Sequence, residues 1–407
     1  MSQYPDPERP VASLAPAELR RRLGADEPVS LLDVRNRSEI EEWRLPGGDR
    51  NRAEIPYMKF VTAEANDAVA DLVGDVTEPV VVVCGRGEAS AYAASLLQGV
   101  GIEAVNLEGG MEGWAELYEA TVVSEAPTVL RYDRPSSGCL AYLVVDGDEA
   151  AVVDPLRAFA DRYVADAAAR GADVRYAVDT HVHADHVSGV RALADRGAEP
   201  VVPAGAVDRG LEDPERFTLL PGDGELAVGG ATLRTVPAPG HTSESVAYRV
   251  GGETGGDGER RGRADGVLLT GDSLFARRVP RPDLEAGAEG AADHARELHR
   301  TLTERFAPLP DDLQVGPGHY DPGDVLSENE GDGDGGDGPR LDRLGAIRER
   351  VAAFGTDREG FVEYVLDRTG ERPANYERIV AVNLGRETAD DETAFELELG
   401  PNNCAAG

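Results

Sequence analysis

Four residues that could bind a metal stand within six positions of one another in the middle of the chain. They lie in the stretch Val-Asp-Thr-His-Val-His-Ala-Asp-His-Val-Ser-Gly (178–189) and are His181, His183, Asp185 and His186. Neutral imidazole and carboxylate are ligands that suit zinc, iron or manganese. The residues before the cluster predict a short strand (174–179), and the apolar spacing after it predicts a helix (186–196). Because side chains at such a turn can converge, the stretch predicts a metal site. The alternative is a histidine-rich loop that binds nothing.

Three more residues of the same types follow downstream, each after a strand-like run and beside a glycine that permits a tight turn. They are His241 in Ala-Pro-Gly-His-Thr, Asp272 in Leu-Leu-Thr-Gly-Asp-Ser and His319 in Val-Gly-Pro-Gly-His-Tyr. Taken together, the seven residues allow a dinuclear hydrolase with a bridging hydroxide. Taken alone, His181, His241 and Asp272 give two imidazoles and one carboxylate, the donor set of mononuclear Fe(II) oxygenases. The spacing does not choose between the two.

A cysteine closes the most continuous β-branched run of the chain, Val-Val-Val-Val-Cys (80–84), and a Gly-Arg-Gly loop then leads into a predicted helix (89–98). A thiol at the end of a buried strand, where a helix begins, faces N–H groups and the positive end of the helix dipole. This setting lowers the pKa of a cysteine and can hold an anionic sulfur adduct. Cys84 is therefore a candidate catalytic residue, and Arg86, the cation of its loop, a candidate substrate-binding residue. Cys139, in Ser-Gly-Cys-Leu-Ala-Tyr, is expected to be a small core residue.

The elements that position these residues fall into two groups. Alternating strands and helices over residues 12–120 predict a parallel α/β domain. Antiparallel strands from residue 128 onward begin a second domain, expected over 127–385 with acidic insertions near 251–266 and 326–339. Residues 121–127 are expected to form a linker, and residues 386–407 a tail.

The composition excludes some classes of partner. Seventy-six acidic residues against 41 basic ones give a formal net charge of −35, and a field of that sign repels nucleic acid and anionic membrane surfaces. A hydrophobic content of 41% argues against disorder. The acidic, lysine-poor composition resembles that of proteins from salt-accumulating cells, where screening removes the self-repulsion. No apolar run approaches the ~20 residues of a membrane span, and the N-terminus is polar, so we expect a cytoplasmic protein.

The order His-x-His-x-Asp-His, His, Asp, His resembles the metallo-β-lactamase superfamily over roughly residues 127–385, which implies an αββα sandwich. The cluster stretch and Thr-Gly-Asp-Ser-Leu-Phe-Ala-Arg-Arg-Val-Pro-Arg-Pro-Asp (270–283) are similar to its persulfide dioxygenase branch. That resemblance implies one Fe(II) per chain on His181, His241 and Asp272, with substrate contacts from Arg281 and Asp283. It implies oxidation of a low-molecular-weight thiol persulfide with O2 to sulfite and thiol. The remaining candidates, either ligands of a second metal or supports of the first, are His183, Asp185, His186 and His319.

Three segments of the N-terminal part resemble a rhodanese (sulfurtransferase) domain, in which the cysteine carries a persulfide. They are Leu-Leu-Asp-Val-Arg, Val-Val-Val-Cys-Gly-Arg-Gly-Glu-Ala-Ser and Leu-Glu-Gly-Gly-Met-Glu-Gly-Trp. Gly85 and Ala89 stand where that family has arginines, so a rhodanese fold without catalysis is the alternative for this domain. For the whole chain, the alternatives are a two-zinc thioester hydrolase of the glyoxalase II type and a sulfur carrier without catalysis. A homo-oligomer is compatible with the sequence.

Overall fold

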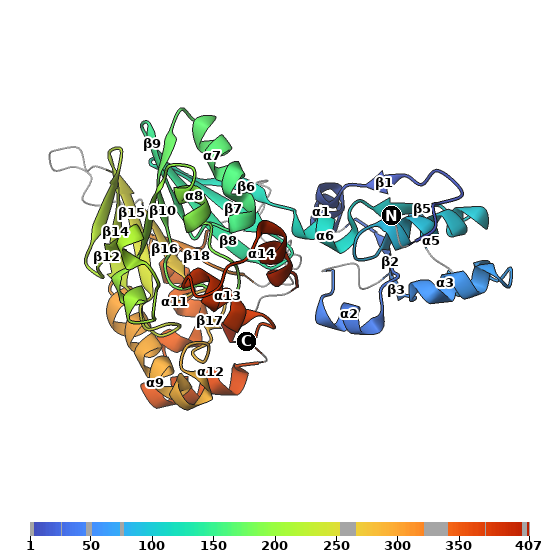
Figure 1. The fold of residues 1–407 in the computed structure, drawn as a ribbon. Helices are drawn as coiled ribbons and strands as arrows, with labels where there is room; N and C mark the ends of the chain where they lie inside the picture. The colour runs from blue at the N-terminus through green and yellow to red at the C-terminus, as the bar shows by residue number, and fades with distance from the viewer. Residues whose placement is uncertain are drawn as a thin grey trace.

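The N-terminal domain is a parallel five-stranded sheet with helices on both faces (Figure 1). The computed structural model describes residues 4–25, 27–45, 51–73, 77–252, 266–320, 341–370, 372–400 and 405–406. The strands, in the sheet order β1-β5-β4-β2-β3, are Ser13–Leu14, Ala104–Leu107, Val80–Val83, Ser30–Asp33 and Arg52–Glu54. The helices α1 to α6 are Pro16–Gly24, Arg37–Glu42, Tyr57–Glu64, Ala70–Val73, Glu88–Gly99 and Gly110–Ala115.

Strand β4 lies at the centre of this sheet because all four of its valines are buried. Val80 and Val82 pack into one apolar cluster, and Val81 and Val83 pack into another on the opposite face, which includes the fully buried Trp114. A strand buried on both faces needs the continuous β-branched run that the sequence supplies. The strand therefore delivers Cys84 to the carboxyl edge of the sheet, at the loop before α5.

The second domain is built on two sheets that face each other. The first has the order β12-β11-β10-β9-β8-β7-β6, with bounds Thr218–Leu220, Glu199–Pro203, Asp173–Val178, Glu149–Val153, Cys139–Asp146, Thr128–Arg134 and Glu119–Glu125. The second has the order β13-β14-β15-β16-β18, with bounds Glu225–Val228, Ala231–Pro237, Val246–Gly252, Val267–Gly271 and Gln314–Pro317. Side chains from both sheets, such as Tyr142, Leu233 and Tyr248, share one core cluster.

Helices cover the outer faces of both sheets (Figure 1). Those of the first sheet are α7 (Ala160–Ala168) and α8 (Val190–Ala194), and those of the second are α9 (Gly287–Arg300), α11 (Leu344–Arg350) and α12 (Arg358–Arg368). Each side has a separate apolar cluster. The layers are therefore helix, sheet, sheet and helix, and the α/β class and the sandwich expected from the sequence are confirmed. No helix within the described ranges is long and apolar enough to cross a membrane.

The junction between the domains differs from the expected linker. Residues 121–127 fall largely within β6, which pairs antiparallel with β7 from Glu119↔Asp133 to Glu125↔Thr128. The β-branched residues of Thr-Val-Val (121–123) favour a strand, and β7 offers a free edge for it. The N-terminal domain therefore continues directly into a sheet of the second domain. The two expected acidic insertions lie almost wholly outside the described residues.

The segment expected as a tail contains ordered structure. Helix α13 (Tyr376–Asn383) precedes helix α14 (Asp391–Leu397). Figure 1 shows α14 on the side of the second domain that faces the N-terminal domain. Strand β19 (Ala405–Ala406) pairs with β17 (Val279–Pro280). Glu398 is 2% exposed and ion-pairs with the fully buried Arg134. Its other carboxylate oxygen accepts a hydrogen bond from the Val187 N–H at 2.8 Å. Asp390 caps α14 by accepting from the Thr393 N–H, and the helix then carries Glu398 to these partners.

Candidate metal centre

Seven histidine and aspartate side chains converge at the ends of strands from both sheets. Four of them stand on the loop that follows β10, and His241, Asp272 and His319 follow β14, β16 and β18. All seven are buried, and none is more than 5% exposed. Because each of these residues follows a strand of one of the two packed sheets, residues separated by up to 138 positions meet at one point.

Three of the seven side chains, His181, His241 and Asp272, direct unpartnered atoms toward one another; we call them the triad. His181 Nε2 and His241 Nε2 lie 3.9 Å and 3.8 Å from Asp272 Oδ2. None of these three atoms has a hydrogen-bond partner within the described residues. Buried polar atoms in proteins are almost always paired, so three orphaned donor atoms at one point fit a bound metal ion. Two imidazoles and a carboxylate are a donor set for Fe(II) and for zinc.

The opposite nitrogen of each triad imidazole is held by the protein. His241 Nδ1 donates to the main-chain oxygen of Arg281 at 2.8 Å. The Thr180 hydroxyl donates to Asp154 Oδ2 at 3.0 Å, so its oxygen is free to accept from His181 Nδ1 at 2.8 Å. These contacts place the proton on Nδ1 and leave Nε2 as the ligand atom. Burial, followed by the charge of His183, lowers the pKa of His181 well below its usual value, which keeps this ligand neutral.

Asp154 supports the loop from behind and was missed by the sequence analysis. It lies after β9 with φ +52°, and its carboxylate also accepts the Thr180 N–H at 2.7 Å. His183 Nε2 lies 3.1 Å from Asp154 Oδ1. Burial opposes protonation of His183, but the charge of Asp154 and its hydrogen bonds raise the pKa well above the usual value. The signal that could have found Asp154 is its place, directly after a buried strand that neighbours β10.

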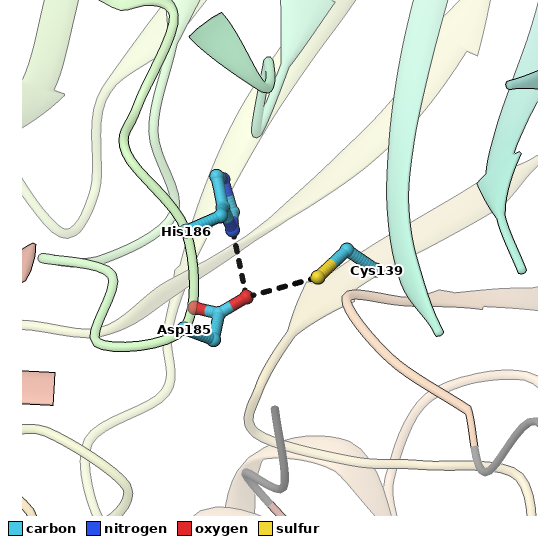
Figure 2. Close-up of side chains that lie close together, drawn as sticks. All are labelled: Cys139, Asp185 and His186. Carbon is cyan, nitrogen blue, oxygen red and sulfur yellow. Dashed lines mark hydrogen bonds and ion pairs between the residues drawn. The ribbon is translucent and has the colours of Figure 1, made fainter. Parts of the chain in front are cut away.

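A second cluster lies beside the triad, and we call its members the thiol cluster: Cys139, Asp185, His186 and His319. Cys139 Sγ lies 3.4 Å from Asp185 Oδ2, and His186 Nδ1 lies 2.7 Å from the same oxygen (Figure 2). Cys139 Sγ also lies 3.2 Å from His319 Nε2. His319 Nδ1 lies 3.2 Å from Asp272 Oδ1, which joins the cluster to the triad. Cys139 does belong to an apolar cluster, as expected, but its sulfur faces polar groups.

The charged groups of the thiol cluster shift one another's pKa values. Burial opposes protonation of His319, but the charges of Cys139, Asp272 and Asp185 raise its pKa well above the usual value. Burial opposes ionisation of the Cys139 thiol, but the charge of His319 and the hydrogen bonds from the neighbouring histidines together lower its pKa. No local pattern indicates this contact, because 180 residues separate the two side chains. The structure joins them through a bridge between the first residue of β8 and the loop after β18.

The predicted substrate residues Arg281 and Asp283 lie next to His241 but are paired with each other. Arg281 is 1% exposed, and its Nε and Nη2 atoms lie 2.8 Å and 3.2 Å from the two oxygens of Asp283. Nη2 also donates to the Gly370 oxygen at 2.8 Å, and Arg372 donates to Asp283 at 2.8 Å. One edge of the guanidinium is therefore occupied, and its role in substrate binding stays a prediction.

In the N-terminal domain, the Gly87 N–H donates to the Cys84 sulfur, and the Ser90 hydroxyl, which also lies 2.6 Å from Asn106 Oδ1, contacts it. The Gly87 N–H and the Ser90 hydroxyl lie 3.1 Å and 3.0 Å from Sγ, and the thiol is 5% exposed. Both groups come from the loop and first turn of α5, as expected for a sulfur held at the start of a helix. Arg86 does not join them. Its side chain is 66% exposed and pairs with Glu112.

Each of the two parts of the chain matches a known protein family. Residues 135–319 match the metallo-beta-lactamase superfamily, and residues 15–117 match the rhodanese-like domain. A hydroxyacylglutathione hydrolase of Anaeromyxobacter dehalogenans is 36% identical over 183 residues, 44% of this chain and 60% of that protein. The human mitochondrial persulfide dioxygenase ETHE1 is 30% identical over 205 residues, 48% of this chain and 70% of that protein. The chain spans only 60% of the first relative's length.

A solved structure agrees on the fold. The metallo-beta-lactamase from Staphylococcus aureus subsp. aureus COL superposes with a TM-score of 0.52 at 22% identity, over 63% of this chain and 72% of that chain. At this identity the likeness speaks for the fold alone. The choice between the two kinds of sequence relative therefore depends on the chemistry of the site.

Removing any triad side chain is expected to abolish tight metal binding, because each supplies one of the three orphaned atoms. His183→Ala should retain the metal, with affinity lowered by about ten- to a hundredfold through loss of its support. The measurement is metal per chain by elemental analysis after purification without oxygen. His294→Ala, on α9, is the matched histidine control. Metal retained in His241→Ala, or lost equally in His183→Ala, would contradict the assignment.

Proposed function

The chain belongs to the metallo-beta-lactamase superfamily and carries an N-terminal rhodanese-like domain, and on this premise we propose that it is an iron-dependent persulfide dioxygenase. In this proposal it oxidises a low-molecular-weight thiol persulfide with O2 to sulfite and free thiol. The observation that carries the proposal is the set of three buried, unpartnered ligand atoms on two histidines and one carboxylate. That donor set is typical of mononuclear Fe(II) oxygenases.

The triad would hold Fe(II), which supplies redox chemistry and open positions for the persulfide sulfur and O2. Hydrogen bonds within the protein hold the side chains of the three ligands in position without the metal. Thr180 and the Arg281 carbonyl hold the two imidazoles, and His319 binds the oxygen of Asp272 that faces away from the triad. Near-complete burial of all three side chains excludes bulk water from the donor atoms. Each of these contacts reduces the reorganisation that metal binding requires.

The rhodanese-like domain supports the same chemistry. The proposed step is Cys84–SH + R–S–SH → Cys84–S–SH + R–SH, in which one sulfur atom moves and no oxidant is needed. The Gly87 N–H and Ser90 hydroxyl would stabilise the anionic form of the carried sulfur. Gly85 and Ala89 depart from the rhodanese pattern, and Arg86 is paired with Glu112. Because the loop offers so little positive charge, we expect slow transfer from doubly charged donors such as thiosulfate.

A second candidate function is a two-zinc thioester hydrolase. The observations that favour it are the relative named hydroxyacylglutathione hydrolase and the thiol cluster, which places further metal-type side chains beside the triad. Two metals that share a hydroxide could attack a thioester carbonyl. The two candidates differ in the metal they need and in whether they consume O2.

The metal-free full chain, reloaded separately with Fe(II) and with Zn(II), distinguishes the two functions. We expect the iron form to consume O2 only when persulfide is present and to release sulfite, because zinc has no redox chemistry. Both forms are assayed in an oxygen electrode and with a glutathione thioester, and Asp272→Ala is the control for chemistry outside the triad. Fast thioester hydrolysis by the zinc form, with no persulfide-dependent O2 uptake by the iron form, would contradict the dioxygenase proposal.

Cys84→Ser should remove sulfur transfer and leave direct persulfide oxidation within about twofold, since additivity holds for distant sites. The readout is mass spectrometry of protein treated with persulfide, in which Cys84 should gain one sulfur atom. Cys404→Ser is the matched cysteine control and should keep the adduct. No adduct on Cys84 would indicate a rhodanese-like fold without catalysis.

Arg281→Ala should lower kcat/KM for a carboxylate-bearing persulfide by roughly ten- to a hundredfold, the effect of one lost charge-assisted hydrogen bond. Metal content should not change, because His241 contacts the main-chain oxygen of this residue. An uncharged persulfide is the matched substrate, and Arg372→Ala, which removes the other arginine from Asp283, is the matched variant. Equal losses on both substrates would show that Arg281 maintains the local structure and does not bind substrate.

A further inference from the structure

A cavity of about 580 Å³ lies beside the loop between β10 and α8 (residues 179–189), which we call the metal loop. Val187 and Ser188 of this loop, helix α8, and Asn383 of α13 form its walls, and its described lining includes none of the seven candidate ligands. Four arginines also line it: Arg157, Arg191, Arg196 and Arg216. Small-molecule sites in proteins have volumes of roughly 300–1,000 Å³. We propose that this cavity binds a small organic phosphate, a molecule with an apolar body and a doubly charged oxyanion head.

Two of the four arginines are neutralised by carboxylates of the same cavity. Arg157 Nη2 lies 2.8 Å from Asp391 Oδ1, and Arg196 Nε lies 2.6 Å from Asp161 Oδ1. Both aspartates belong to the lining. These two pairs therefore add no net charge to the cavity, and the charge that a ligand meets depends on the other two arginines.

The guanidinium of Arg191 is held in place but lacks an acceptor. It lies over the ring of Phe217, 4.6 Å from the ring centre, and its Nη2 atom is buried without a hydrogen-bond partner among the described residues. Burial, followed by the charge of Arg216, lowers the pKa of Arg191, so the two guanidiniums lie close enough to repel each other. A buried donor beside a second guanidinium fits an anion that the chain does not supply. Two guanidiniums suit a phosphate head, because each can donate two parallel N–H bonds to its oxygens.

The two other carboxylates of the lining do not fill this role. Both oxygens of Asp179 accept the Ser188 hydroxyl, at 2.9 Å and 2.7 Å, and its Oδ1 lies 3.6 Å from His183 Nε2. Asp195 is exposed at the C-terminal end of α8. The rest of the wall suits the organic part of the ligand, because it contains four buried valines, Val187, Val190, Val202 and Val382.

The cavity shares two residues with the support of the metal loop. The Ser188 N–H donates to Asn383 Oδ1 at 2.9 Å, and Asn383 Nδ2 donates to the main-chain oxygens of His183 and His186 at 3.0 Å and 2.9 Å. A ligand in the cavity would therefore contact the residues that hold this loop in place, and its binding should slow local opening of the loop. The inference holds whichever reaction the triad performs.

Phenyl phosphate is the probe, and phenyl sulfate, which has the same shape but one charge fewer, is its matched comparison. The full chain is titrated by calorimetry at about pH 8, where the phosphate is doubly charged. We expect one saturable site per chain, with phenyl sulfate bound at least about tenfold more weakly. Arg191→Met and Arg216→Met should each weaken phosphate binding by roughly ten- to a hundredfold, through loss of charge-assisted hydrogen bonds. Arg175→Met is the matched control, because Arg175 also lies over an aromatic ring, Tyr176, but does not line the cavity.

Two further measurements separate this site from the triad and from misfolding. Asp272→Ala, which removes a candidate metal ligand, should bind the probe unchanged, and the probe should slow hydrogen exchange of the Ser188 N–H in the unaltered protein. Arg216 is exposed, so its substitution leaves the core intact. The proposal is overturned by a lack of saturable binding, by equal binding of phenyl sulfate, by full-strength binding in Arg216→Met, or by equal weakening in Arg175→Met. Loss of binding in Asp272→Ala would place the probe on the triad metal and also overturn it.

Discussion

The triad brings together three buried polar atoms that have no hydrogen-bond partner among the described residues, and the surrounding domain is arranged around this constraint. An unpaired buried polar group costs roughly 1–3 kcal/mol. The structure tolerates the three in the triad because the opposite nitrogen of His181 is held by Thr180, and that of His241 by the Arg281 carbonyl. Held in this way, neither imidazole can turn to bond Asp272, and the three atoms stay poised for a cation. A bound metal would offset the cost that the protein alone must carry.

The loop that carries four of the seven candidate ligands is supported from distant parts of the chain. Asp154 holds its start through Thr180, and Asn383 of α13 donates to the main-chain oxygens of His183 and His186. Glu398 accepts the Val187 N–H and neutralises the buried Arg134, which in turn donates to the Ala115 oxygen of the N-terminal domain. Phe395 and Leu399 pack against the core of that domain. The C-terminal segment therefore connects the metal loop to the rhodanese-like domain.

The sequence predicted the features that depend on local pattern. The β-branched run before Cys84, the turns that carry His181, His241, Asp272 and His319, and the two sheet types all follow from residue spacing. Spacing alone did not divide the seven candidate ligands. The resemblance to the persulfide dioxygenase branch singled out His181, His241 and Asp272, and the spacing could not, because the division depends on which ring nitrogen each support holds. Cys139 was expected to be simple core because its polar partners lie at least 46 residues away in sequence. The tail was expected to be loose because the pairing of Glu398 with Arg134 spans 264 residues.

If the triad holds Fe(II) with positions open to the persulfide, those positions should also bind nitric oxide. Electron paramagnetic resonance of the anaerobic, iron-loaded full chain exposed to nitric oxide tests it most directly. We expect a high-spin iron–nitrosyl signal from the unaltered protein. The signal should be lost in His241→Ala and should change when a thiol persulfide is added. Open positions on a two-histidine, one-carboxylate site make both effects possible. Iron that gives no such signal, or a signal that persulfide leaves unchanged, would contradict the account.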